Sequence, residues 1–201
     1  NTITEENFHQ LYQISSGDYL PDEDRLLPDH FYRHDDVFIV GGEESRAGIP
    51  VIQLANAMKR LVDFANAKDG INELHKAAIL HFAFAYYHPY FDGNGRTARL
   101  LHLWYLVQQG YPAALFTPFS RYIAESKAAY YKAYYRVEKN ALISGYTDIT
   151  PFLSYFCNEV YNRLQVDAAP PQADLQVYQI AFAEGKITEK ERLLWEYVLS
   201  A

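Results

Sequence analysis

The stretch HPYFDGNGRTAR, from His88 to Arg99, combines residue types that neither a core helix nor an ordinary turn requires. A histidine and a proline end an apolar run, an acid and Gly-Asn-Gly follow, and two arginines come next, three positions apart. The first N–H groups of a helix lack intrahelical partners and carry the positive end of its dipole, so a glycine-rich turn ahead of a helix binds anions. We therefore predict an anion site in the turn from Asp92 to Gly95, ahead of a helix that begins at Arg96.

The charged residues of this stretch indicate which anion is bound. Arg96 and Arg99 would project from one face of the helix, and two guanidiniums suit a polyphosphate better than a single carboxylate. Asp92 would repel that ligand unless a cation intervened, and Mg²⁺ on a polyphosphate usually takes only one or two protein carboxylates. Because a histidine ordinarily titrates near neutrality, we expect His88 to be the general base for a hydroxyl that attacks phosphorus. The stretch therefore predicts phosphoryl or nucleotidyl transfer.

Each of these residues alone has a simpler explanation. His88 and Asp92 could cap helices, Gly95 could serve only a turn, and the arginines could form surface salt bridges. The concentration of all of them in one short stretch favours the functional explanation. The stretch is not a Walker A phosphate loop, because it contains no Gly-Lys-Ser/Thr.

Helices are predicted on both sides of the stretch. Residues 72–87, NELHKAAILHFAFAYY, are apolar nearly all round, so we expect a buried central helix. It should end at His88, because Pro89 disfavours helical backbone at the residue before it. The following helix should be closed by Gly110. Further helices are predicted from an N-cap at Thr4, from Pro50 to Gly70, over 121–145 and over 148–165.

A different pattern precedes the helix at Pro50. VFIVGG, from Val37 to Gly42, has four β-branched or aromatic residues running into two glycines, which predicts a short β-hairpin. Such a hairpin could pack as a lid on a helical body, could bind an extended peptide along its edge, or could be an ordinary loop with a hydrophobic anchor. The predicted fold class is all-α with one small β-hairpin.

Composition limits the kind of protein. The chain has 201 residues, 49% hydrophobic and 21% charged, which describes a soluble globular protein. A net charge of −7 argues against broad binding of nucleic acid or acidic membranes. Cys157 is the single cysteine, so an intrachain disulfide is excluded and a buried inert thiol is expected. With no signal peptide and no apolar run of transmembrane length, we expect a cytoplasmic protein without membrane contact.

HPYFDGNGRTAR resembles the signature of Fic-domain proteins, His-Pro-Phe-x-Asp/Glu-Gly-Asn-Gly-Arg-x-x-Arg, with Tyr90 where Phe is usual. The order and type of elements are similar over roughly Thr4 to Leu164. The resemblance implies a Fic domain over residues 1–167, with a hairpin flap over about 36–50 ahead of the active-site helices. Residues 168–201 would then be a linker and the start of a truncated helical module, similar to the winged-helix module of some Fic proteins.

The resemblance also implies an activity, transfer of AMP from ATP, with Mg²⁺, to a Ser, Thr or Tyr hydroxyl of a protein target, and self-modification. His88 would deprotonate the target and Asp92 would hold Mg²⁺ between the α- and β-phosphates. The residues implied to bind ATP are Gly93, Asn94 and Gly95 as the anion hole, Arg96 and Arg99 on the outer phosphates, and Tyr130 or Tyr131 at the adenine. The flap residues implied to pair with the target are Phe38, Ile39, Val40, Gly41 and Gly42.

Other activities and partners stay open at this stage. The same site could remove AMP from a target, transfer another phosphate-linked group, or act as a regulatory nucleotide-binding module. Kinase-type relatives carry Lys where Gly95 stands, which argues against phosphate transfer. Many Fic proteins carry an inhibitory helix, Ser/Thr-x-x-x-Glu-Gly/Asn. TITEEN fits it at Thr2, Glu6 and Asn7, but in the wrong helix, so an inhibitory helix, if there is one, is expected upstream of Asn1 or on a partner. Fic proteins often dimerise, so a homodimer is also open.

The remaining histidines are not predicted to bind metal. His75, His81 and His88 are spaced six and seven residues apart, and no HExxH is present. His81 and His88 lie two helical turns apart, too far to chelate one zinc ion from a continuous helix. We expect His75, His81 and His102 to be packing or surface residues.

Overall fold

The computed structural model describes residues 2–17, 20–41, 44–163, 180–187 and 189. The chain divides into two compact units, Asn1–Tyr161 and Asn162–Ala201. Most of the second unit, which includes the predicted C-terminal module, lies outside the described residues. Its described part includes a short helical stretch over 180–183. Among the described residues, no helix has the length and apolarity needed to cross a membrane.

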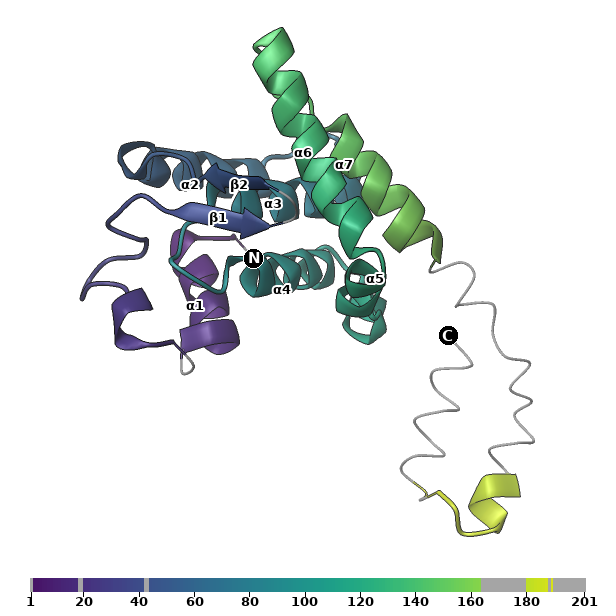
Figure 1. Cartoon of the computed structure of the whole chain (residues 1–201). Helices are drawn as coiled ribbons and strands as arrows, with labels where there is room; N and C mark the ends of the chain where they lie inside the picture. The colour runs from purple at the N-terminus through teal and green to yellow at the C-terminus, as the bar shows by residue number, and fades with distance from the viewer. Residues whose placement is uncertain (1, 18–19, 42–43, 164–179, 188, 190–201) are drawn as a thin grey trace. The chain divides into compact units, whose positions relative to one another are not determined.

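The first unit is built around two helices, α3 (Glu73–Tyr87) and α4 (Asn94–Gln108) (Figure 1). Asn72 caps α3 by accepting a hydrogen bond from the Leu74 N–H. The prediction of a buried helix is confirmed, since Ala77, Ala78, Leu80 and Phe84 are fully buried. α4 contributes Ala98 and Leu101, also fully buried. The signature stretch forms the loop between these two helices and continues into the start of α4.

Two helices flank this pair, α1 (Glu5–Ser16) packing on α4 and α2 (Val51–Asn66) packing on α3. Thr4 is the N-cap of α1, as predicted, and forms a capping box with Asn7. Asn7, which fitted the inhibitory pattern, therefore has a structural use here. Pro50 is the N-cap residue of α2 rather than its first helical residue.

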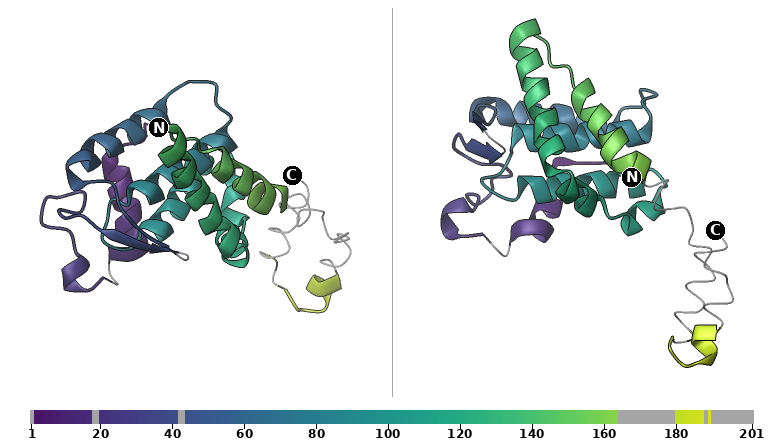
Figure 2. Two further views of the ribbon diagram at one scale, coloured as in Figure 1. Left: turned by 45° about the horizontal axis from the view of Figure 1, so that its top comes forward. Right: turned by 45° about the vertical axis from the view of Figure 1, so that its right-hand side comes forward.

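The C-terminal part of the unit comprises α5 (Phe119–Glu125), α6 (Lys127–Ser144) and α7 (Thr150–Tyr155). α7 continues into a π-helical turn, Phe156–Tyr161, and 3₁₀ turns occupy Asp22–Asp24 and Pro112–Phe116. The single helix predicted over 121–145 is wrong, because the chain breaks at Ser126, whose Oγ donates to the Tyr122 carbonyl at 2.7 Å. α6 and α7 pack on each other, and the end of α6 extends past the other helices (Figures 1 and 2).

The predicted hairpin is present as strands β1 (Phe38–Gly41) and β2 (Glu44–Ala47), which pair antiparallel with Phe38 opposite Ala47. We call this hairpin the flap. Arg46 on β2 anchors it to the helices, because its guanidinium lies 2.8 Å from Glu138 of α6 and 4.4 Å from the ring centroid of Tyr86. The flap therefore packs on the helical body at one strand. Phe38 is 80% exposed, and Gly42 lies outside the described residues.

His81 and His102 pack inside the core, as predicted. Both are 1% exposed, with ring centroids 5.9 Å apart, and burial lowers the pKa of each well below its ordinary value. His81 Nε2 lies 3.0 Å from the Tyr130 hydroxyl. The thiol of Cys157, expected to be buried, is only half-buried and lies 3.9 Å from His75 Nε2.

Candidate active site

The loop between α3 and α4 turns sharply at its first residue. His88 follows α3 as its C-cap in the left-handed region, with φ 55° and ψ 62°. Pro89 excludes a further helical turn, and a left-handed non-glycine residue costs about 1–2 kcal/mol. The loop is closed by Asn94, whose Nδ2 donates to the Tyr90 carbonyl at 2.8 Å and whose Oδ1 accepts from the Tyr90 N–H at 2.9 Å. The Asn94 side chain therefore shapes the loop, and its backbone N–H is left for an anion.

The imidazole of His88 has a defined tautomer. Nδ1 lies 3.3 Å from the carbonyl oxygen of Ala85, and since a carbonyl only accepts, Nδ1 carries the proton and Nε2 keeps a free lone pair. Burial lowers the pKa of His88 to about 4. The Ala85 carbonyl and Asp92 raise this pKa, while Arg46 and Arg33 lower it. His88 is therefore neutral at physiological pH, as a general base must be.

The start of α4 is open to an anion. α4 begins at Asn94, two residues earlier than predicted, because Gly93 supplies the left-handed N-cap with φ 80°. No side chain caps this end and no acid lies in its first turn. The N–H groups of Asn94, Gly95 and Arg96 precede the first intrahelical hydrogen bond and face outward from the helix end. This geometry agrees with the predicted anion site.

The two glycines of the stretch have different reasons to be glycine. A Cβ on Gly93 would lie 2.3 Å from Ser16 Oγ, so the close approach of α1 requires glycine there, in addition to its positive φ. A Cβ on Gly95 would meet only Arg99 Nη1, at an ordinary 3.6 Å. Gly93 is thus needed by the fold, whereas the packing alone does not require Gly95.

Asp92 and Arg96 form an exposed ion pair, with Arg96 Nη2 3.1 Å from Asp92 Oδ2. The salt-bridge alternative for this arginine is therefore observed, although such exposed pairs contribute little. Among the described residues, no three acids, histidines or cysteines gather to hold a metal ion. A single exposed carboxylate beside an anion site fits Mg²⁺ that a polyphosphate and water coordinate for the most part.

Arg99 differs from Arg96 in its surroundings. It is partly buried, one turn further along α4, and its charge lowers the pKa of His81 and of Tyr130. In the described part of the chain its guanidinium is in no ion pair. Arg99 therefore has a positive charge available for a ligand.

The two tyrosines expected at the adenine are placed differently. Tyr130 lies in the core, with its hydroxyl 3.0 Å from His81 Nε2 and 3.3 Å from the Tyr134 hydroxyl. It is only 8% exposed, and its role at the adenine stays a prediction. Tyr131 is partly exposed, and Lys127 Nζ lies 5.9 Å from the centroid of its ring. Its role at the adenine stays a prediction.

One buried residue near the site was missed from the sequence. Arg33 lies in the polar loop ahead of the flap, yet its Nε donates to the His88 carbonyl at 2.8 Å. Its neighbours in the sequence are mostly exposed and polar, so no periodicity singled it out.

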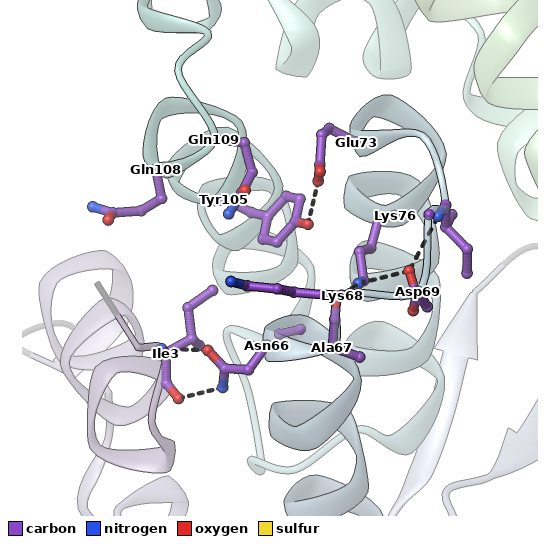
Figure 3. A pocket seen from close by; sticks show the side chains of 13 residues that line it. Ile3, Asn66, Ala67, Lys68, Asp69, Glu73, Lys76, Tyr105, Gln108 and Gln109 are labelled. Carbon is purple, nitrogen blue, oxygen red and sulfur yellow. Dashed lines mark hydrogen bonds and ion pairs between the residues drawn. The ribbon is translucent and has the colours of Figure 1, made fainter.

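A separate pocket lies at the other end of α3 and α4 (Figure 3). Lys76 projects into it and pairs with Asp69 at 3.1 Å, while the Tyr105 hydroxyl donates to Glu73 at 2.5 Å. Asn66 bonds the main chain of Ile3. These polar groups satisfy one another, so the arrangement stabilises the helix ends and offers no reactive group.

Comparisons with known proteins agree with this geometry. The Fic/DOC family model matches residues 2–106. The chain is 31% identical over 100 residues to the protein adenylyltransferase fic-1 of Caenorhabditis elegans, covering 49% of this chain and 17% of that protein. It is 31% identical over 138 residues to a probable protein adenylyltransferase of Aquifex aeolicus, covering 66% of this chain and 42% of that protein. The chain thus spans less than half the length of these relatives.

Solved structures show the same fold. A Fic family protein from Desulfovibrio desulfuricans superposes with a TM-score of 0.62 at 24% identity, covering 83% of this chain and 49% of that one. A Fic-domain signalling protein from Bacteroides thetaiotaomicron superposes with a TM-score of 0.58 at 22% identity, covering 81% of this chain and 61% of that one. The family model covers more than half of the chain, and the helical fold with its hairpin agrees with it. The chain therefore belongs to the Fic/DOC family.

Proposed function

We propose that this chain is a protein adenylyltransferase, which transfers AMP from Mg²⁺-bound ATP to a Ser, Thr or Tyr hydroxyl of a target protein. The observation that carries the proposal is the position of His88, whose Nδ1 faces the Ala85 carbonyl so that Nε2 keeps its lone pair, one short loop away from the uncapped start of α4. A base for a hydroxyl and a site for phosphate are thereby held on one rigid pair of helices. The names of the relatives, protein adenylyltransferases, support the same chemistry.

The proposed reaction assigns one task to each group. His88 Nε2 accepts the proton of the target hydroxyl, whose oxygen attacks the α-phosphorus of ATP. A bond forms between that oxygen and phosphorus, the bond from phosphorus to the bridging oxygen breaks, and pyrophosphate leaves. The N–H groups at the start of α4 and the charge of Arg99 stabilise the negative charge on the phosphates.

Asp92 is the residue that would hold Mg²⁺, and the ion would neutralise phosphate charge. For this, Asp92 must release Arg96, to which it is paired at 3.1 Å. The release costs little because both side chains are well exposed. It also leaves Arg96 available to the phosphates that Asp92 approaches through the ion. Both residues would thus bind the same Mg²⁺-ATP once their ion pair is broken.

The flap would present the target. β1 pairs with β2 on one side, and in the described part of the chain no strand pairs with its other edge. An extended target segment can add to that edge through main-chain hydrogen bonds. Because Arg46 binds the carbonyl of Tyr86 at 3.2 Å, near the end of α3, the flap is fixed close to His88.

The test is incubation of the chain with Mg²⁺ and either α-³²P-ATP or γ-³²P-ATP, with self-modification as the surrogate target. We expect label from the α-phosphate alone, lost in His88→Ala. His75→Ala is the matched control, since His75 is an exposed histidine of α3, the helix that ends just before His88. Label from the γ-phosphate would mean kinase chemistry and would contradict the proposal. Binding of ATP without any transfer, even to candidate targets, would favour the regulatory alternative.

A further inference from the structure

Arg33 has a buried guanidinium that is bonded almost entirely to main-chain carbonyls. Its side chain is 0% exposed. Nε donates to the His88 carbonyl at 2.8 Å, Nη1 to the Asp35 carbonyl at 2.6 Å and Nη2 to the Ile49 carbonyl at 2.5 Å. The Arg33 N–H also donates to the Pro89 carbonyl at 2.9 Å. One residue therefore binds both His88 and Pro89.

The three main-chain carbonyls that accept from the Arg33 side chain come from three separate segments. His88 begins the loop that carries the proposed base, Asp35 precedes β1, and Ile49 follows β2. A guanidinium is planar, with donors in a fixed fork, so it sets the relative positions of its acceptors as a flexible ammonium cannot. Both ends of the flap are thus tied to the backbone of His88.

Burial of this cation is not explained by charge pairing. The carboxylate of Asp36 lies 3.6 Å from Nη1, is 72% exposed and also accepts from the Val51 N–H. Burial lowers the pKa of Arg33, with Asp36 acting in the opposite direction. A buried charge without close pairing costs free energy. The carbonyl bonds offset that cost, and what they determine is the geometry of the loop and the flap.

We propose that Arg33 is a positioning residue, which holds the left-handed turn at His88 and fixes the flap relative to it. The inference rests on the proposed adenylyl transfer, which supplies the roles of the base and the flap. Arg33 touches no substrate and acts through His88. By holding the His88 carbonyl, it keeps the main chain turned so that Nδ1 reaches Ala85 and Nε2 faces away from it.

A kinetic consequence distinguishes positioning from general support. No bond of Arg33 reaches the start of α4, Arg96 or Arg99, so binding of Mg-ATP should survive its replacement. Misplacement of a catalytic group by about 1 Å can cost about 10²-fold in rate. Loss of Arg33 should therefore lower kcat for AMP transfer and leave the ATP affinity nearly unchanged.

The test compares Arg33→Lys and Arg33→Met with Arg25→Met, an exposed arginine of the same loop paired with Asp22. Circular dichroism establishes that each variant is folded. We expect kcat to fall about 100-fold for the Met variant and about 10-fold for the Lys variant, with the Kd of Mg-ATP, from calorimetry, within about twofold. Arg25→Met should behave as wild type. Folded Arg33 variants with wild-type kcat, or with ATP affinity falling in step with kcat, would overturn the inference.

Gly48→Ala supplies a variant that retains Arg33, in case the others do not fold. A Cβ there would lie 3.2 Å from Arg33 Nη2 and 3.0 Å from Val37 Cγ2, so it would displace the guanidinium slightly. We expect a smaller loss of kcat in the same direction, again without loss of ATP affinity. An unchanged kcat in folded Gly48→Ala and Arg33→Lys would count against the role of Arg33.

A second measurement does not depend on activity. In ¹⁵N NMR spectra, the His88 ring of the wild-type chain should show the Nδ1–H tautomer, and Arg33→Lys should show a mixture with the Nε2–H tautomer. If the wild-type chain transfers no AMP, the proposed function fails, while the spectra still decide whether Arg33 orients His88. Identical His88 spectra in wild type and folded Arg33→Lys would refute the inference by itself.

Discussion

Tyr90→Phe should stabilise the protein. Tyr90 is fully buried in the signature stretch, its ring stacks on that of Tyr12 at 3.6 Å, and its hydroxyl has no hydrogen-bond partner among the described residues. A buried, unbonded polar group costs about 1–3 kcal/mol. Phe keeps the ring and its stacking and removes only the hydroxyl oxygen, so the loss of packing is small.

We therefore expect the free energy of unfolding to rise by about 1 kcal/mol. In a unit of this size, that change raises Tm by about 2–4 °C. Thermal and urea unfolding followed by circular dichroism measure it. The rate of AMP transfer should stay unchanged, since the Asn94 bonds to Tyr90 use only the backbone of Tyr90.

Tyr105→Phe is the matched control, and we expect it to lower the free energy of unfolding. Tyr105 is as deeply buried, at 2% exposed, but its hydroxyl donates to the Glu73 carboxylate at 2.5 Å. Removal of a hydrogen bond to a charged group should destabilise by about 1.5–3 kcal/mol. If Tyr90→Phe destabilised the protein as Tyr105→Phe does, the hydroxyl of Tyr90 would have to be bonded, and the reasoning would fail.

Three other predictions concern the site directly. Gly93→Ala should destabilise the protein by at least about 1–3 kcal/mol in urea unfolding, because of its positive φ and its contact with α1, whereas Gly95→Ala should keep stability and weaken ATP binding in calorimetry. Asp92→Asn should abolish Mg²⁺-dependent AMP transfer in the label assay but change stability by less than about 0.5 kcal/mol, because its ion pair with Arg96 is exposed; a large stability loss would contradict this. The pKa of His88 is about 4 when folded and ordinary when unfolded, so the unfolded state binds the proton more readily, and unfolding experiments should show stability falling as pH drops from about 6.5 through 4. In the free enzyme kcat/KM should likewise hold until pH approaches 4, and an acid limb near 6.5 would refute the burial argument.

Local patterns in the sequence were enough to predict much of the fold. The apolar run of 72–87, the N-cap at Thr4 and the β-branched residues of the hairpin each act through neighbours in the chain, and each is confirmed. The errors arise where local signals compete. Gly93 and Gly95 both allow a helix to start after them. The hydrogen bonds between Asn94 and the Tyr90 main chain favour the start that follows Gly93. Arg33 could not be found, because its acceptors are main-chain carbonyls, which any sequence provides, and two of them are distant in the chain.

The two arginines of the signature show where sequence reasoning about a site reaches its limit. Spacing made Arg96 and Arg99 equivalent, as two cations on one helical face. The structure separates them, because Asp92 lies four residues before Arg96 and takes it as an exposed partner, while Arg99 is partly buried next to the core histidine His81. In the proposed reaction, Arg96 is therefore an exchangeable counter-ion whose release prepares Asp92 for Mg²⁺. In the same proposal, Arg99 would be the fixed charge that attracts the phosphates.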